Sequence, residues 1–186
     1  MKNLTRRKFS AIALGAGLFL AACGNGIGSG GAEKIDARVD VTLDYLYRTI
    51  PETQDLASKA SGILVMPLIT EAGFGLGGSF GRGALQVQGA TVDYYSAAQA
   101  SIGLQIGAQQ FAHVMFFMTD EALMDFRASQ GWVAGAEVEY AYSERGENIA
   151  ADTTTATSPV VAVVFGQAGL IAGATIEGTK YTRIIP

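Results

Sequence analysis

The stretch AGFGLGGSFGRGAL, residues 72–85, decides the fold, because six of its fourteen residues are glycine. Gly73, Gly75 and Gly78 within it match G-x-G-x-x-G, the glycine pattern of dinucleotide-binding loops. Such a loop leads into a helix whose N-terminus holds the pyrophosphate. The residues that follow here, SFGRGALQVQG at 79–89, contain more glycine and then alternate apolar and polar side chains as a strand does. We therefore expect no dinucleotide and no other cofactor.

The glycine spacing instead indicates a strand with one flat face. Gly73, Gly75 and Gly77 occupy every second position, and successive side chains of a strand point to opposite faces. A face without side chains lets another strand, a helix or a ligand come close to the backbone. The predicted approach face comprises Gly73, Gly75, Gly77, Gly78, Gly81 and Gly83.

Two helices and a strand are predicted before the glycine-rich stretch. Residues 34–50 place apolar side chains on one stripe at helical spacing, and this helix ends before Pro51. Residues 51–61 form a second, short helix with Pro51 in its first turn. Residues 62–69 are an apolar strand that ends near Pro67.

Strands and one further helix are predicted after it. Strand patterns extend to residue 117, and residues 119–130 form a helix with Thr119 as its N-cap. Residues 132–143 and 160–184 are strand-like again, and a polar loop separates them. This order predicts an α+β fold with a largely antiparallel, glycine-rich twisted sheet or partial barrel. The N-terminal helices and the one inserted helix would pack on that sheet.

The first 22 residues resemble an export signal. Basic residues precede an apolar run at 11–22, which is shorter than the about 20 residues that span a bilayer and suits the core of a signal peptide. Arg6 and Arg7, followed by Lys8 and Phe9, resemble a twin-arginine signal, with the general secretion route as the alternative.

Residues 20–23, LAAC, resemble a bacterial lipobox, in which the cysteine takes palmitate or another acyl chain and becomes the first mature residue. Cys23 is the single cysteine, so no disulfide is possible within the chain. Residues 23–32 would form a flexible lipidated tether, and residues 33–186 one domain. By resemblance to enteric sorting rules, Gly24 favours the outer membrane. The expected location is lipid-anchored, on the periplasmic side of a bacterial cell envelope; an ordinary signal peptide with an incidental cysteine is the alternative.

Charge and composition exclude several classes of function. Four of the thirteen Lys and Arg residues lie in the signal and none of the seventeen Asp and Glu residues does, so the mature chain carries about eight negative charges. Such a body is a poor nucleic-acid partner. His113 is the single histidine, has apolar neighbours, and is expected in a core or strand. With no G-x-S-x-G and no free thiol, we expect no catalytic residue, no metal site and no enzyme.

Five sequence blocks in order resemble the SYLF domain, a family of bacterial lipoproteins and of eukaryotic endocytic proteins that bind phosphoinositides and actin. Together they span most of residues 34–182. The blocks are SGILVMP at 61–67, AGFGLGGSFGRGAL at 72–85, GLQIGAQ at 103–109, MTDEALMDF at 118–126 and GLIAGATIEG at 169–178.

The resemblance implies non-enzymatic binding of a membrane lipid, with an anionic phospholipid or phosphoinositide-like headgroup; actin has no meaning in a periplasm and is not carried over. The first helix and nearby cations would contribute, and Arg82 between two glycines could hold a phosphate. Lipid binding further predicts a groove lined by aromatic residues among Phe74, Phe80, Phe111, Phe116 and Trp132. The alternative is an envelope scaffold that self-associates through flat glycine-rich faces. The candidate lipid-binding residues are Lys34, Arg38, Arg48, Lys59 and Arg82.

Overall fold

The computed structural model describes residues 29–135, 138–140, 158–166, 169–170 and 176–186. The predicted export signal with Arg6 and Arg7, the lipidation site Cys23 and most of the predicted polar loop lie outside these residues.

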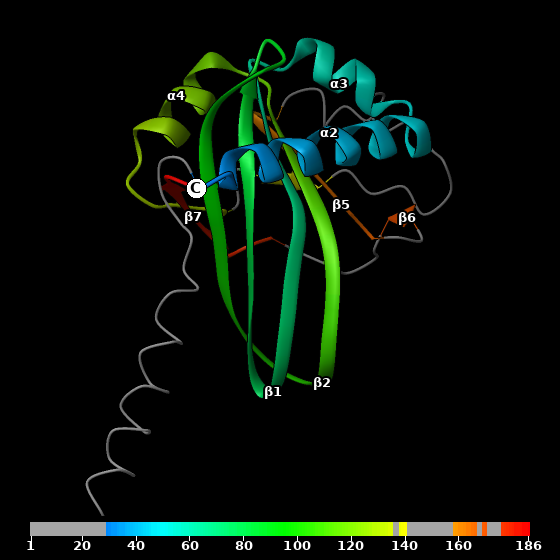
Figure 1. The fold of residues 1–186 in the computed structure, drawn as a ribbon, viewed down its shortest axis with the longest axis vertical. Helices are drawn as coiled ribbons and strands as arrows, with labels where there is room; N and C mark the ends of the chain where they lie inside the picture. Colours follow the sequence, from blue (N-terminus) through cyan, green and yellow to red (C-terminus); the bar gives the residue numbers. More distant parts are fainter. Residues whose placement is uncertain (1–28, 136–137, 141–157, 167–168, 171–175) are drawn as a thin grey trace, which may run out of the picture.

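The fold is α+β, as predicted: the described residues form three helices and a seven-stranded sheet that curls into a half-barrel (Figure 1). The strand pairings are antiparallel except for one parallel pair, β4 with β5. The elements are α2 (Gly31–Thr49), α3 (Thr53–Lys59), β1 (Gly62–Val87), β2 (Ala90–Phe117), α4 (Asp120–Ala128), β3 (Trp132–Val133), β4 (Val138–Tyr140), β5 (Val160–Gly166), β6 (Gly169–Leu170) and β7 (Lys180–Ile184).

Strands β1 and β2 form one long two-stranded ribbon. They contain 26 and 28 residues, pair along their whole length, and are joined by a two-residue turn at Gln88 and Gly89, both with positive φ. Figure 1 shows both strands running to the lower end of the molecule and returning, so the ribbon is folded back on itself. Near this bend Gly73 pairs with Gly107 and Gly75 with Gly103, and a register shift between these pairs supplies a bulge.

The prediction that the first strand ends near Pro67 is wrong. Met66 pairs with His113 and Ile69 with Phe111, so Pro67 and Leu68 together oppose a single residue of β2. Proline has no N–H to donate to the ladder, and a bulge is where a strand tolerates it. The strand therefore continues through Pro67 to Val87.

The prediction of one strand over residues 132–143 is also wrong. Ala134 and Gly135 separate β3 from β4, and the two strands pair with different partners, β7 and β5. The amide of Val138 donates to the carbonyl of Gly135 at 3.2 Å. The predicted N-cap is confirmed, since the amide of Ala122 donates to the hydroxyl of Thr119 at 3.2 Å.

Two hydrophobic cores lie on opposite faces of β5. Alternate residues of this strand enter one core with both halves of the ribbon and α4, or the other core beneath α2 and α3. The predicted apolar stripe of the first helix packs into the second core, as Ile35, Val39, Leu43, Leu46 and Ile50. The helix begins beside Pro186, so the start of the domain and the end of the chain lie together (Figure 1).

The bend divides β1 into an outgoing half, residues 62–73, and a returning half, residues 75–87. These two halves approach each other at glycine residues. A Cβ on Gly83 would overlap the carbonyl oxygen of Val65 and lie 2.5 Å from the sulfur of Met66. A Cβ on Gly81 would overlap the carbonyl oxygen of Leu68 and the side chain of Ile69. The backbone of the returning half therefore lies directly against the outgoing half, which no other residue type permits.

We predict that Gly83→Ala lowers the free energy of unfolding by about 1–3 kcal/mol, because the added methyl group must push two packed backbones apart. Gly78→Ala on the same strand is the matched control, since its Cβ would meet only the carbonyl oxygen of Gln99 at 3.1 Å. Urea unfolding of both variants measures the difference. Equal effects of the two substitutions would contradict this account of the close approach.

Candidate functional site

Three of the five predicted cations converge on one hollow beside α2. Lys34 and Arg38 lie one helical turn apart on α2, and Arg82 comes from the returning half of β1. The hollow has a volume of about 390 Å³. No acidic residue is among the described residues that line it, so the charged side chains of its lining are all basic. The lining residues are Ser29, Gly31, Lys34, Ile35, Arg38, Pro67, Leu68, Thr70, Phe80, Gly81 and Arg82.

Strand alternation explains the position of Arg82. Gly81 and Gly83 are buried against the outgoing half of β1, so the residues at even positions point the other way. Phe80 is 52% exposed, and the guanidinium of Arg82 lies 6.0 Å from the centre of its ring. The close approach of the two halves thus presents a cation and an aromatic ring at the hollow.

A second, mainly apolar hollow of about 240 Å³ continues the first. Pro67 and Leu68 line both, so the two hollows meet at the bulge of β1. We call the combined feature the α2 groove, with a basic section and an apolar section. The apolar section is lined by Val41, Thr42, Tyr45, Pro67, Leu68, Gln110, Phe111, Ala112, Phe165 and Gly166.

One face of α2 explains why the groove has a basic section and an apolar section. Lys34, Arg38, Val41 and Tyr45 follow one another at spacings of three or four residues, which places them on one face of a helix. The face is therefore basic near the start of α2 and apolar further along.

The other two predicted cations do not line the groove. Arg48 pairs with Asp44 at 2.5 Å and Lys59 pairs with Asp55 at 2.6 Å, each within its own helix. Both pairs are exposed, and pairs of this kind contribute little to stability. The structure thus separates Arg48 and Lys59 from Lys34, Arg38 and Arg82.

Two of the five aromatic residues that were predicted to line a groove do so. Phe80 and Phe111 line the groove, whereas Phe116 and Trp132 pack into or against the hydrophobic cores. The side chain of Phe74 lies outside the described residues. The sequence did not lead us to expect the apolar section around Val41, Tyr45 and Leu68. Its signal was Pro67, because a proline within a strand pattern indicates a bulge, and this bulge lines the section.

Asp36, the acidic residue between Lys34 and Arg38 in the sequence, is engaged elsewhere. Asp36 accepts hydrogen bonds from the hydroxyl groups of Thr91, at 3.0 Å, and Tyr94, at 2.8 Å. These bonds tie the first turns of α2 to the start of β2. Partial burial and the hydrogen bond to Asp36 raise the pKa of Tyr94 to about 12.

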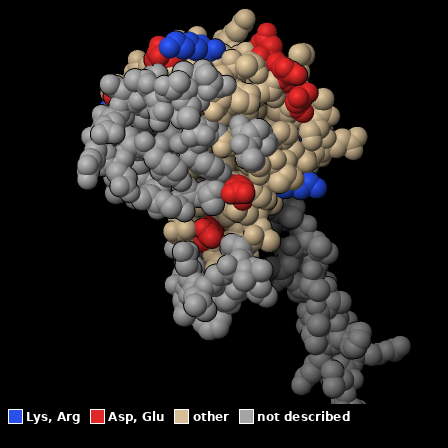
Figure 2. All heavy atoms as spheres, turned by 180° about the vertical axis from the view of Figure 1, so that it is seen from behind, with Lys and Arg blue, Asp and Glu red and all other residues tan. Residues whose placement is uncertain are grey.

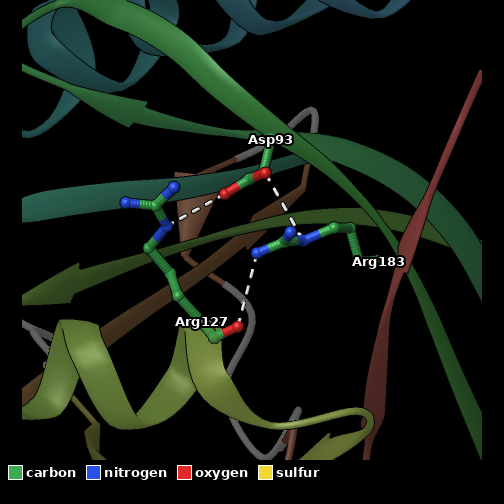
Figure 3. Close-up of polar contacts among 3 residues, drawn as sticks. All are labelled: Asp93, Arg127 and Arg183. Carbon is green, nitrogen blue, oxygen red and sulfur yellow. Dashed lines mark hydrogen bonds and ion pairs between the residues drawn. The ribbon is translucent and has the colours of Figure 1, made fainter.

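A second charged cluster joins α4 to the sheet (Figure 3). The carboxylate of Asp93 lies 2.9 Å from Nε of Arg127 and 3.4 Å from Nε of Arg183. Arg183 also donates to the carbonyl oxygen of Arg127 at 3.3 Å. The carboxylate neutralises part of the positive charge, and we interpret the cluster as a clamp that positions α4.

The single histidine lies in the interior. Its Nε2 is 2.8 Å from the hydroxyl oxygen of Tyr181, and burial lowers the pKa of His113 to about 3. Within the described ranges, no group of three His, Cys, Asp or Glu residues could hold a metal ion. None of the described helices is long and apolar enough to cross a membrane. In the view from behind, the described part of the surface shows both acidic and basic side chains among mainly uncharged residues (Figure 2).

Comparison with known families gives a match to part of the chain. Residues 98–183 match the family Ysc84, described as Las17-binding protein actin regulator. This agrees with the resemblance to the SYLF domain seen in the sequence. The matched segment contains α4, β5 and most of β2 and β7, whereas the three cations of the groove precede it. No curated protein matches the chain.

We predict that Tyr94→Phe lowers the free energy of unfolding by about 1 kcal/mol at neutral pH, through loss of the hydrogen bond to Asp36. Because folding raises the pKa of Tyr94, its contribution is complete below pH 10 and is lost as the pH rises through about 12. The advantage of the wild type over Tyr94→Phe should therefore shrink across that interval.

Urea unfolding at several pH values between 8 and 12 measures this difference. Thr91→Val is the control, because it removes the other donor to Asp36 but no group that titrates. A wild-type advantage over Tyr94→Phe that stays constant to pH 12 would disprove the assigned coupling.

Proposed function

Because residues 98–183 of this chain match the family Ysc84, in agreement with the resemblance to the SYLF domain, we propose that the protein binds membrane lipid and has no enzymatic activity. The observation that carries the proposal is the convergence of Lys34, Arg38 and Arg82 on the α2 groove. The lipid would be an anionic phospholipid or a phosphoinositide-like lipid, with its headgroup in the basic section.

The chemistry of the basic section suits a phosphate group. Guanidinium groups bind phosphate oxygens through two parallel, charge-assisted hydrogen bonds, and an ammonium adds a compact charge. Phe80 beside Arg82 is exposed and can lie at the level of lipid headgroups. A chain with a net negative charge needs such a local cluster to bind an anion.

The predicted anchor would hold the groove close to a membrane. Ser29 lines the basic section, and Cys23 lies six residues before it. Six extended residues span at most about 20 Å. We propose a lipoprotein exported by a twin-arginine signal and anchored by palmitate or related acyl chains at Cys23. Its location would be the periplasmic side of the outer membrane.

The interior position of His113 supports the absence of catalysis. A general base must reach a substrate proton, directly or through one water molecule. The histidine is 1% exposed and is hydrogen-bonded to Tyr181. A Ser-His-Asp arrangement would need this residue at a surface.

Self-association through glycine-rich faces is the weaker hypothesis. Gly81 and Gly83 are already covered by the outgoing half of β1, so they are unavailable to a second copy. The cations of the groove also have no role in that hypothesis. We therefore favour lipid binding over a scaffold.

We predict that the mature chain, residues 23–186 with Cys23→Ser to remove the acyl anchor, co-sediments with vesicles that contain an anionic phospholipid. Each groove cation near the lipid surface should contribute about 1 kcal/mol, or about fivefold in affinity. Arg82→Ala should thus weaken binding about fivefold and Lys34→Ala/Arg38→Ala about 25-fold. High salt should weaken binding further.

The double variant Arg48→Ala/Lys59→Ala is the matched control, because it also removes two cations that α2 and α3 carry outside the groove. It should bind as the wild type does. Equal losses in the two double variants would mean that charge alone, without a site, governs binding. Absence of binding to every vesicle composition, with concentration-dependent association in ultracentrifugation, would support the scaffold.

A further inference from the structure

We propose that the α2 groove takes a single-chain anionic amphiphile, with its charged head in the basic section and its alkyl chain in the apolar section. This inference rests on the proposed function and names the class of lipid. It differs from headgroup docking, in which the chains would stay in the bilayer and the protein would contact the surface only.

The apolar section presents large apolar side chains to solvent. Val41 on α2 is 68% exposed, and Leu68 at the bulge is also exposed. The ring of Tyr45 stacks on Phe165, with centroids 5.9 Å apart, and both residues line the section. Exposed apolar groups gathered around a hollow indicate a binding surface. Headgroup docking would leave this section without an occupant.

The polarity of the groove matches an amphiphile. The cations lie near the start of α2 and the apolar residues lie further along the same face. From Lys34 to Tyr45 the helix rises about 16 Å, at about 1.5 Å per residue. Pro67 and Leu68 join the sections, so a bound molecule can pass from one to the other.

The size of the apolar section favours one chain. Its volume of about 240 Å³ is below the about 300–1,000 Å³ of sites that enclose drug-sized ligands. It is lined by residues of α2, of the bulge in β1, and of β2 and β5. A lipid with two chains would leave its second chain in water or in the bilayer.

The test is a homologous series of octyl, decyl and dodecyl phosphate, each below its critical micelle concentration. Isothermal titration calorimetry with residues 23–186 carrying Cys23→Ser gives the affinities, and circular dichroism checks that each variant is folded. Each buried methylene should tighten binding about fourfold, so decyl phosphate should bind about 15-fold more tightly than octyl phosphate. Inorganic phosphate reports the head alone and should bind more weakly than any of the three.

Substitutions in each section distinguish its contribution to binding from that of the other section. Arg82→Ala should weaken all three alkyl phosphates by the same factor, because it acts on the head. Val41→Gln/Leu68→Gln should reduce the gain per methylene, because it acts on the chain. The matched control is Met124→Gln/Val133→Gln, which makes the same change at two exposed apolar residues that do not line the groove. This control should leave unchanged both the affinity for each alkyl phosphate and the gain in affinity per methylene.

Two failures can be distinguished. Affinities that do not depend on chain length, together with vesicle binding that still depends on Arg82, would overturn this inference and leave the proposed function intact. Loss of both alkyl phosphate binding and vesicle binding would overturn the proposed function itself. A gain per methylene that persists in Val41→Gln/Leu68→Gln would place the chain elsewhere and would also overturn the inference.

Discussion

The structure depends on the contact between the two halves of β1. A two-stranded ribbon of this length can fold back on itself only where one half has no side chain facing the other. Gly81 and Gly83 provide that face against Val65, Leu68 and Ile69. The other strands then extend the two halves: β5 pairs with the second half of β2, and β7 with the first. The half-barrel and its internal core follow from this single approach.

The same contact creates the groove. Alternation along β1 turns Arg82 outward because its two glycine neighbours face inward. On the outgoing half, Pro67 forces a bulge, and the bulge turns Leu68 out of the ladder beside the returning strand. Helix α2 covers one side, since its apolar stripe is fixed in the second core. The groove therefore lies where a helix, a bulge and a glycine crossing meet.

Local sequence patterns predicted the helices and most strands. The path of the long ribbon depends on contacts between residues far apart in the sequence, which no local pattern shows. The helical stripe, the Thr119 cap and the α+β order depend on neighbours within a few residues, and each is confirmed. The path of the strand beyond Pro67 and the fold of the ribbon depend on residues 12 or more positions away, such as Gly83 against Val65. For the same reason the sequence could propose five cations but could not say which three converge, or that an apolar section adjoins them.

The negative charge of the chain and a site for an anion are compatible because electrostatic interactions at the surface are short-ranged. At physiological ionic strength, charges separated by more than about 8 Å are largely screened. The ligand would respond chiefly to the three cations that line its hollow, provided that nearby carboxylates are directed elsewhere. Asp36 is one residue that could offset them, because it lies between Lys34 and Arg38 in the sequence. Its two oxygens instead accept hydrogen bonds from Thr91 and Tyr94. The bonds that fix the start of α2 thus also keep its carboxylate away from the basic section.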